Sequence, residues 1–207
     1  MTVWFTADPH IGHANILSYE DRPFESVEEM DSVLLDYWRT LLKRGDRFCI
    51  LGDVALRGRH VQQALDSIPE GVQVYYILGN HDHRYRSLIK SYSCVVWCGD
   101  MREVKVEGQR IVLCHYAMRS WPSSQHGSWQ LHGHSHNGLY PWERQLDVGV
   151  DSARELVGEC RPLSFEEVAH FIGNGENPKV MAESFGISPS WMGGDHHESR
   201  SGVLERR

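Results

Sequence analysis

Polar side chains of metal-binding type follow five of the apolar segments of this chain. Each of these segments has the length and composition of a buried β-strand. The side chains at their ends are Asp8, His10, Asp53, Asn80, His81, His115, His134 and His136. Because ligands bind at the carboxyl ends of strands in open α/β sheets, we expect these residues to converge on one edge.

Seven segments in all have the hydrophobic pattern of β-strands, and turn-forming residues separate them. The first three alternate with helical patterns, which predicts parallel pairing. The fourth and fifth are separated by a few residues that include a glycine, as in a β-hairpin. The strands are expected over residues 3–6, 47–51, 72–78, 104–106, 110–114, 129–131 and 146–150.

Two helices have clear start signals. Ser26 with Glu29, and Ser164 with Glu167, have the spacing of a capping box, in which two side chains bind each other's backbone N–H groups. Apolar residues follow both boxes at helical spacing. A further short helix is expected over residues 61–68.

The chain length allows one core of ordinary size. Of the 207 residues, 41% are hydrophobic, which is marginal for two cores. We therefore expect one domain over residues 1–172. Residues 173–207 mix Gly, Ser, Pro and charges without an apolar period, and we expect a C-terminal extension that is loosely attached or disordered.

Charge and hydropathy exclude two classes of protein. The net charge of −7 argues against a protein that coats nucleic acid with a broad basic face. No apolar run approaches the roughly 20 residues that span a bilayer, and the N-terminal residues lack the pattern of a signal peptide. We expect a cytoplasmic protein with no membrane partner.

The donor types at the strand ends indicate a divalent first-row cation. Imidazole nitrogens together with carboxylate and amide oxygens suit Mn²⁺, Fe²⁺, Ni²⁺ or Zn²⁺. A structural zinc site is disfavoured, because no cysteine stands at these positions. Among these cations we expect Mn²⁺.

The five loops together resemble the calcineurin-like metallophosphoesterase superfamily, and two of them look like loops of its small bacterial and phage branch. The superfamily signature is Asp-x-His, Gly-Asp, Gly-Asn-His-Asp/Glu, a lone His, and Gly-His-x-His. All five blocks occur in this order, as Asp8-Pro9-His10, Gly52-Asp53, Gly79-Asn80-His81-Asp82, His115 and Gly133-His134-Ser135-His136. The resemblance implies an α/β fold of two packed mixed β-sheets flanked by helices.

The resemblance also implies a site with two divalent metal ions per chain. The implied ligands are Asp8, His10 and His136 for one ion, Asn80, His115 and His134 for the other, and Asp53 between both. The implied reaction is hydrolysis of a phosphate ester by metal-bound hydroxide. His81 would protonate the leaving oxygen or stabilise charge on the phosphoryl group.

The expected substrate is a phosphodiester of a nucleotide, a cyclic nucleotide or a nucleic-acid end. A small-molecule phosphomonoesterase and a catalytically dead binding scaffold are the alternatives. Serine/threonine protein phosphatases of the superfamily carry an Asp where this chain has Leu56, which disfavours that activity. The sequence leaves the physiological substrate and the oligomeric state open.

Basic and aromatic side chains near the same loops are candidates for substrate contacts. The basic ones are His13, Arg57, Arg84 and Arg119. An Arg fork suits phosphate oxygens, although solvated surface is the alternative for each of them. The aromatic ones, for which packing is favoured over base stacking, are Trp121, Trp129, Tyr140 and Trp142.

Overall fold

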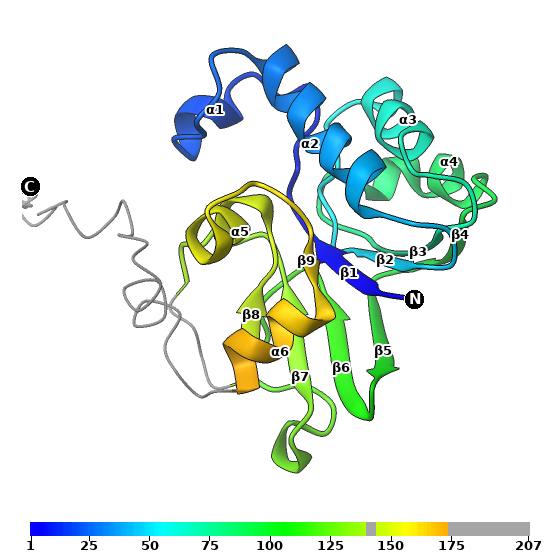
Figure 1. Cartoon of the computed structure of the whole chain (residues 1–207), viewed down its shortest axis with the longest axis vertical. Coiled ribbons are helices and arrows are strands. Elements are labelled where there is room, and N and C mark those ends of the chain that lie inside the picture. The colour runs from blue at the N-terminus through cyan, green and yellow to red at the C-terminus, as the bar shows by residue number, and fades with distance from the viewer. Residues whose placement is uncertain (140–143, 174–207) are drawn as a thin grey trace, which may run out of the picture.

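The computed structural model describes residues 1–139 and 144–173 of the chain. Within these ranges, a pair of β-sheets pack together and helices flank them (Figure 1). This arrangement confirms the predicted α/β class. The predicted C-terminal extension lies outside the described residues except for Gly173.

The first sheet has the strand order β4-β3-β2-β1-β9. Strands β1 (Val3–Thr6), β2 (Arg47–Ile50), β3 (Gln73–Ile77) and β4 (Val95–Gly99) are parallel, and β9 (Leu163–Ser164) runs antiparallel to β1. The parallel pairing predicted for β1, β2 and β3 is confirmed. Their carboxyl ends therefore lie at one edge.

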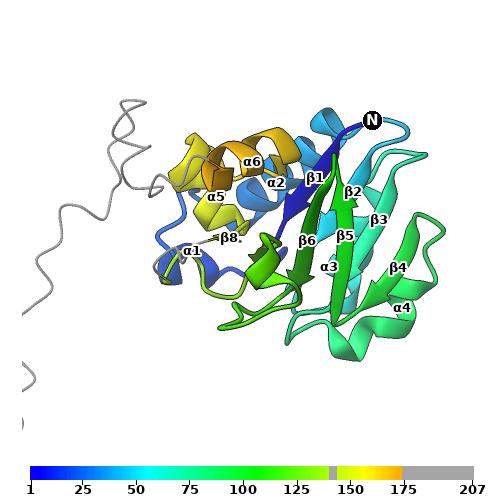
Figure 2. The ribbon, with the colours of Figure 1, turned by 90° about the horizontal axis from the view of Figure 1, so that it is seen from below.

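The second sheet has the order β5-β6-β7-β8. Strands β5 (Met101–Val106) and β6 (Gln109–Cys114) form the predicted hairpin, and β7 (Trp129–His132) and β8 (Gln145–Asp147) extend the sheet in parallel with β6. Both sheets are thus mixed. Figure 2 shows β5 and β6 in front of β1, β2 and β3.

Two layers of buried apolar side chains hold the domain together. Helices α2 (Val27–Leu41) and α3 (Gly58–Asp66) pack on one face of the first sheet, where the rings of Trp38 and Phe48 meet edge to face at 5.0 Å. The opposite face packs against the second sheet, and the side chains there include the fully buried Phe5. Burial of each such side chain contributes roughly 1.5–3 kcal/mol.

Helices α5 (Val150–Val157) and α6 (Phe165–Gly173) contribute to the layer between the sheets. The capping box at Ser164 and Glu167 is confirmed: Ser164 Oγ accepts from Glu167 N at 3.2 Å, and Glu167 Oε2 accepts from Ser164 N at 2.8 Å. At the start of α2 only half of the predicted box forms, because Glu29 binds the N–H of Glu25 instead of that of Ser26.

Several short elements were not predicted. They are α1 (Ile16–Tyr19), α4 (Arg86–Lys90), β4, α5, β9 and the 3₁₀ turns His83–Tyr85 and Ser124–His126. The predicted strand over residues 146–150 is wrong in its second half. The chain leaves the second sheet after Asp147, whose Oδ1 accepts from Gly149 N at 2.8 Å, and Val150 N then donates to Ala7 O at 3.0 Å.

Among the described helices, none combines the length and the apolar character that crossing a membrane requires.

Candidate metal centre

The loops after β1, β2, β3, β6 and β7 meet at the carboxyl edge of the two sheets. Backbone hydrogen bonds join them directly: Asp8 N donates to Gly52 O at 3.0 Å, and Gly133 N donates to His115 O at 3.0 Å. The side chains that these loops carry fall into two adjoining groups.

The first ligand group consists of Asp8, His10 and His136. One potential ligand atom from each lies within 4.8 Å of the other two. Asp8 and His10 are buried, yet Asp8 Oδ1 and both ring nitrogens of His10 have no hydrogen-bond partner among the described residues. Buried polar atoms without a partner are costly, and a cation would supply one.

The second ligand group consists of Asp53, His115 and His134, whose ligand atoms also lie within 4.8 Å of one another. His115 Nδ1 lies 2.7 Å from Leu51 O and must donate to it, because a carbonyl only accepts. The lone pair of Nε2 in neutral His115 therefore faces Asn80 Oδ1 at 3.1 Å and Asp53 Oδ2 at 3.5 Å. Three facing electron-pair donors repel one another unless a cation lies between them.

The two groups adjoin where His115 approaches Asp8. His115 Nδ1 of the second group lies 4.0 Å from Asp8 Oδ1 of the first. Asp53 Oδ1 accepts from His81 N at 2.9 Å, which leaves Oδ2 as the oxygen that faces the imidazoles of His81 and His115. All seven predicted ligands thus lie at this edge.

Several residues of the same loops have strained backbone conformations with positive φ. The candidate ligands with positive φ are Asp8 (55°), His10 (52°), Asp53 (54°), His134 (66°) and His136 (46°). A non-glycine residue in this region costs of order 1–3 kcal/mol and persists where the surroundings hold it, as at functional sites. The strained loop conformations therefore accompany the convergence of these side chains.

Close approach of the loops explains two of the motif glycines. A Cβ on Gly79 would lie 2.1 Å from Asp53 Oδ1, and a Cβ on Gly133 would lie 2.4 Å from Asp8 Oδ2. Any other residue at either position would collide with the carboxylate of the adjacent loop and push that loop away.

The carboxylates of Asp8 and Asp53 repel each other. Burial and the neighbouring carboxylates of Asp147 and Asp53 raise the pKa of Asp8 well above its usual range. Burial also raises the pKa of Asp53, but the hydrogen bond and charge that His115 supplies when it is protonated, together with the N–H of His81, outweigh it and lower that pKa to about 2. A divalent cation would relieve the repulsion between the two carboxylates.

The pKa values of three of these imidazoles shift in different directions. Burial lowers the pKa of His10 to about 3 and lowers that of His134. Burial acts in the same direction on His136, but its hydrogen bond to Asp151 outweighs this and raises the pKa. Neutral imidazole is the form that binds metals, so His10 and His134 already have the required protonation state.

Two buried charged residues beside the first ligand group were not predicted. Asp151 Oδ2 accepts from His136 Nδ1 at 2.8 Å, and the guanidinium of Arg22 pairs with the same carboxylate at 2.8 Å. Burial raises the pKa of Asp151, but His136 and Arg22 outweigh it and lower the pKa to about 2. Asp151 follows a strand-like run, as the predicted ligands do, whereas no sequence pattern singles out Arg22.

Asp82, the last residue of the Gly-Asn-His-Asp block, joins two of the loops. Its Oδ2 accepts from Asp53 N at 2.7 Å and from Gly79 N at 2.9 Å. The motif includes this residue, but no sequence pattern assigns it a role.

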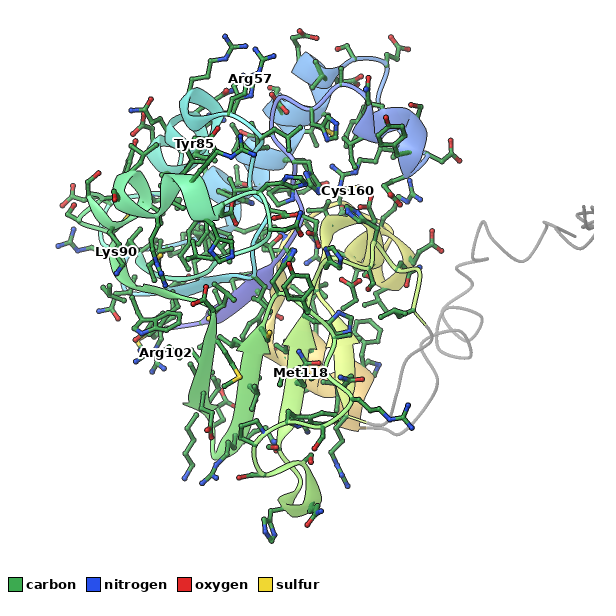
Figure 3. All side chains as sticks on the ribbon, turned by 180° about the vertical axis from the view of Figure 1, so that it is seen from behind. Arg57, Tyr85, Lys90, Arg102, Met118 and Cys160 are labelled. Carbon is green, nitrogen blue, oxygen red and sulfur yellow. The ribbon has the colours of Figure 1, made fainter. Side chains whose placement is uncertain are left out.

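Of the predicted substrate contacts, one lies beside the first ligand group and three are exposed on the surface. His13 lies next to the first ligand group, with its ring centroid 5.6 Å from that of His10. Arg57, Arg84 and Arg119 are exposed, and the guanidinium of Arg84 lies over the ring of Tyr85 at 5.7 Å. Figure 3 shows Arg57 at the start of α3 and Met118, the neighbour of Arg119, beside the second sheet.

The aromatic residues near the last loops are packing residues where the structure describes them. Trp121 is buried and donates from Nε1 to Ser128 O at 3.1 Å. Trp129 stacks on Phe165 with ring centroids 5.9 Å apart. Packing, which the sequence favoured, is thus confirmed for both; Tyr140 and Trp142 lie outside the described residues.

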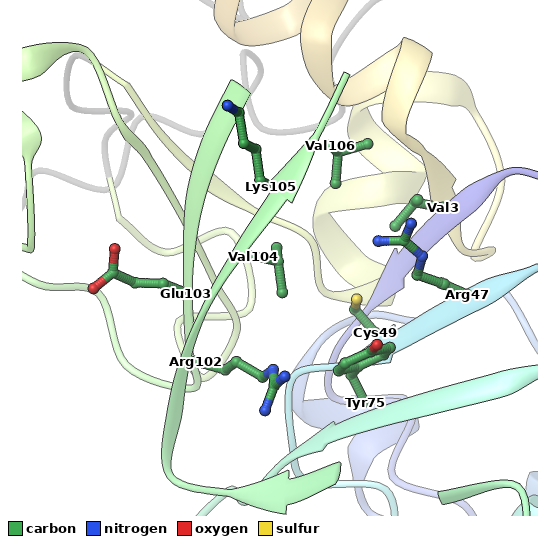
Figure 4. A pocket seen from close by; sticks show the side chains of 9 residues that line it. All are labelled: Val3, Arg47, Cys49, Tyr75, Arg102, Glu103, Val104, Lys105 and Val106. Carbon is green, nitrogen blue, oxygen red and sulfur yellow. The ribbon is translucent and has the colours of Figure 1, made fainter. Parts of the chain in front are cut away.

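A separate cavity of about 210 Å³ lies at the opposite end of the parallel strands. Its walls include Val3, Arg47 and Tyr75 from the first sheet and Arg102 and Val104 from β5 (Figure 4). Arg102 stacks over Tyr75 at 5.1 Å. No candidate metal ligand lines this cavity.

The fold and the centre together define a class: α/β proteins in which two mixed sheets carry, at their strand ends, His and Asp groups of the kind that binds divalent metal ions. The family model described as calcineurin-like phosphoesterase matches residues 1–158. The chain belongs to the calcineurin-like phosphoesterase family.

Relatives of similar length are found in an archaeon and in phages. The chain is 26% identical over 178 residues to the uncharacterized protein MJ1445 of Methanocaldococcus jannaschii, covering 84% of this chain and 93% of that protein. It is 28% identical over 184 residues to the Gene 66 protein of Mycobacterium phage L5, covering 74% and 88%. A crystal structure of AQ665 from Aquifex aeolicus, a protein of unknown function, shares the fold with a TM-score of 0.61 at 20% identity, covering 83% of this chain and 99% of that one.

Proposed function

We propose that this protein hydrolyses a phosphodiester with the help of two divalent cations, Mn²⁺ being the best activator. The observation that carries the proposal is the pair of adjoining ligand groups, in which Asp8 Oδ1 and both ring nitrogens of His10 have no hydrogen-bond partner among the described residues. Asp8, His10 and His136 would hold one cation, and Asn80, His115 and His134 would hold the other. Asp53 would contact both, through the carboxylate that lies beside His115.

When bound, two such cations would supply Lewis acidity toward phosphoryl oxygens and would lower the pKa of bound water. The hydrogen bonds of the protein orient the side chains that would bind these cations. The hydrogen bond from His115 Nδ1 to Leu51 O fixes the ring so that Nε2 points into the centre. The N–H groups of His81 and His134 orient the carboxylates of Asp53 and Asp8 at 2.9 and 2.8 Å.

His81 is the proposed proton donor to the leaving oxygen. Its side chain is 35% exposed and its Nε2 lies 3.7 Å from Asp53 Oδ2, at the mouth of the centre. Its imidazole ring also lies 5.8 Å from that of His10. A partly exposed imidazole at this place is accessible both to solvent and to a substrate oxygen.

Tyr116 supports a substrate that carries a base. Its side chain is 44% exposed, and its ring lies 4.9 Å from that of His115 and 4.8 Å from that of His134. An exposed aromatic ring beside the centre offers a face on which a nucleobase can stack. A nucleotide, a cyclic nucleotide or a nucleic-acid end is therefore the preferred substrate class over a small phosphomonoester.

A substrate comparison tests this function. Metal-free protein supplied with Mn²⁺ should hydrolyse bis(p-nitrophenyl) phosphate and thymidine 5′-(p-nitrophenyl phosphate) faster than p-nitrophenyl phosphate. Faster turnover of the monoester would replace the diesterase with a phosphomonoesterase. Absence of turnover on all three with Mn²⁺, Fe²⁺, Ni²⁺ and Zn²⁺ would favour a binding scaffold.

A further inference from the structure

Arg22 lies in the loop between α1 and α2 and is buried against the first ligand group. Its side chain is 0% exposed, and that of its partner Asp151 is 4% exposed. A guanidinium with all its donors removed from water is costly unless each donor finds an acceptor.

All five N–H donors of Arg22 have partners. Nε and Nη2 donate to the two oxygens of Asp151, each at 2.8 Å, in a bidentate fork. Nη2 also donates to Asp8 O at 2.7 Å, and Nη1 donates to Pro9 O at 2.9 Å and faces Met30 Sδ at 3.4 Å. Because every donor of the guanidinium is used, this position is specific for Arg; Lys offers three donors without the planar fork.

The partners of Arg22 adjoin all three members of the first ligand group. The Asp151 carboxylate accepts from His136 Nδ1 at 2.8 Å, which leaves Nε2 as the nitrogen of His136 that can bind a cation. The carbonyls that Arg22 holds belong to Asp8 and to Pro9, which precedes His10.

Those carbonyls lie in the strained segment of the loop. Asp8 and His10 have φ angles of 55° and 52°. Hydrogen bonds to the intervening carbonyls offset some of the cost of this conformation, of order 1–3 kcal/mol for each residue. The segment that carries Arg22 is itself anchored to α5, since Arg154 Nη1 donates to Asp21 O at 2.6 Å.

We propose that Arg22 is a positioning residue for one cation site: through Asp151 it orients His136, and through two carbonyls it holds the loop of Asp8 and His10. This inference rests on the proposed function, because it assigns the first ligand group to a cation. The second ligand group has its own supports in Leu51 O and Asp82, so Arg22 acts on one site only.

The test is titration of Co²⁺ into metal-free protein, followed by calorimetry and by visible absorption. Wild-type protein should bind two Co²⁺ ions. Arg22→Gln and Asp151→Asn should each weaken one binding phase by about 10–100-fold and leave the other phase unchanged. The double variant should lose less than the sum of the two single losses, because both changes break the shared Arg22–Asp151 pair.

Arg161→Gln is the matched control. Arg161 forms a bidentate pair with Glu167 at 2.7 and 3.2 Å, between the start of α6 and the turn before β9, so its loss reports the general cost of breaking such a pair. We expect this variant to lose thermal stability while both Co²⁺ affinities stay at the wild-type value. If Arg22→Gln does not fold, Asp151→Asn, which is nearly isosteric, carries the test.

Two results would overturn the inference alone: unchanged Co²⁺ affinities in Asp151→Asn, or equal weakening of both phases, which would indicate a general structural role. A wild-type protein that binds no Co²⁺ would overturn the proposed function and this inference together.

Discussion

At the residue scale, the candidate centre is defined by which atoms already have partners. His115 Nδ1 and Asp53 Oδ1 have hydrogen-bond partners in the protein, whereas Asp8 Oδ1 and the nitrogens of His10 have none among the described residues. Potential ligand atoms of Asp8, His10 and His136 lie within 4.8 Å of one another, which favours a cation over a purely structural hydrogen-bond network.

His81→Ala tests the proposed proton donor. We expect turnover to fall roughly a hundredfold or more, and the loss to be larger for an alkoxide than for a p-nitrophenolate leaving group, because the better leaving group needs less protonation. Metal content should stay at the wild-type value. The neighbouring exposed His83 offers a control, since His83→Ala should change neither quantity. Equal losses for both leaving groups would contradict proton donation.

Arg57→Ala tests whether the exposed basic residues contact substrate. Arg57 is exposed at the start of α3, shortly after Asp53, and an Arg fork suits phosphate oxygens. We expect KM for a nucleotide diester to rise or turnover to fall. Arg44→Ala is the control, because Arg44 is 78% exposed and pairs with Glu70 at the other end of the first sheet. Identical kinetics for the two variants would make Arg57 ordinary solvated surface.

At the element scale, the sequence predicted those elements whose signals are local. The box at Ser164 and Glu167 identified the start of α6, because both hydrogen bonds lie within four residues. Helix α5 was missed because Leu146, Val148 and Val150 alternate as in a strand. The chain instead changes sheets there and pairs Gly149 with Ala7, a long-range contact that no local pattern encodes.

Glu167→Gln tests the energetics of the α6 start. Burial raises the pKa of Glu167, but Arg161 and Ser164 outweigh it, so the folded pKa lies below the unfolded value. The ionised group therefore stabilises the fold above the unfolded pKa of about 4.5, and this contribution disappears as pH falls through the folded pKa. We expect the variant to lose about 1–2 kcal/mol at pH 7 in urea unfolding, and much less near pH 3. An equal loss at both values would contradict the assignment.

At the scale of the whole molecule, both sheets contribute candidate ligands to one edge. Asp8 and Asp53 follow strands of the first sheet, and His115 and His134 follow strands of the second. The convergence of these residues could be predicted because each follows its own strand within a short motif. Arg22 and Asp151 could not be paired from the sequence, because they are 129 residues apart and meet only when the α1 loop packs on α5.

Cation binding should therefore stabilise the association of the two sheets. A ligand that binds only the folded state at a hundred times its Kd adds about 2.7 kcal/mol. We expect EDTA to lower Tm and Mn²⁺ to restore it, as measured by differential scanning calorimetry. A Tm that is independent of both reagents would indicate that the centre does not bind Mn²⁺.

The most direct test of the central claim is the metal content of wild-type protein and of Asp53→Asn, measured together with hydrolysis of a diester after reconstitution with Mn²⁺. We predict two ions per wild-type chain. In Asp53→Asn we predict weaker binding of both ions and loss of activity, because this carboxylate is proposed to contact both. Full occupancy with unchanged activity in Asp53→Asn would contradict the account.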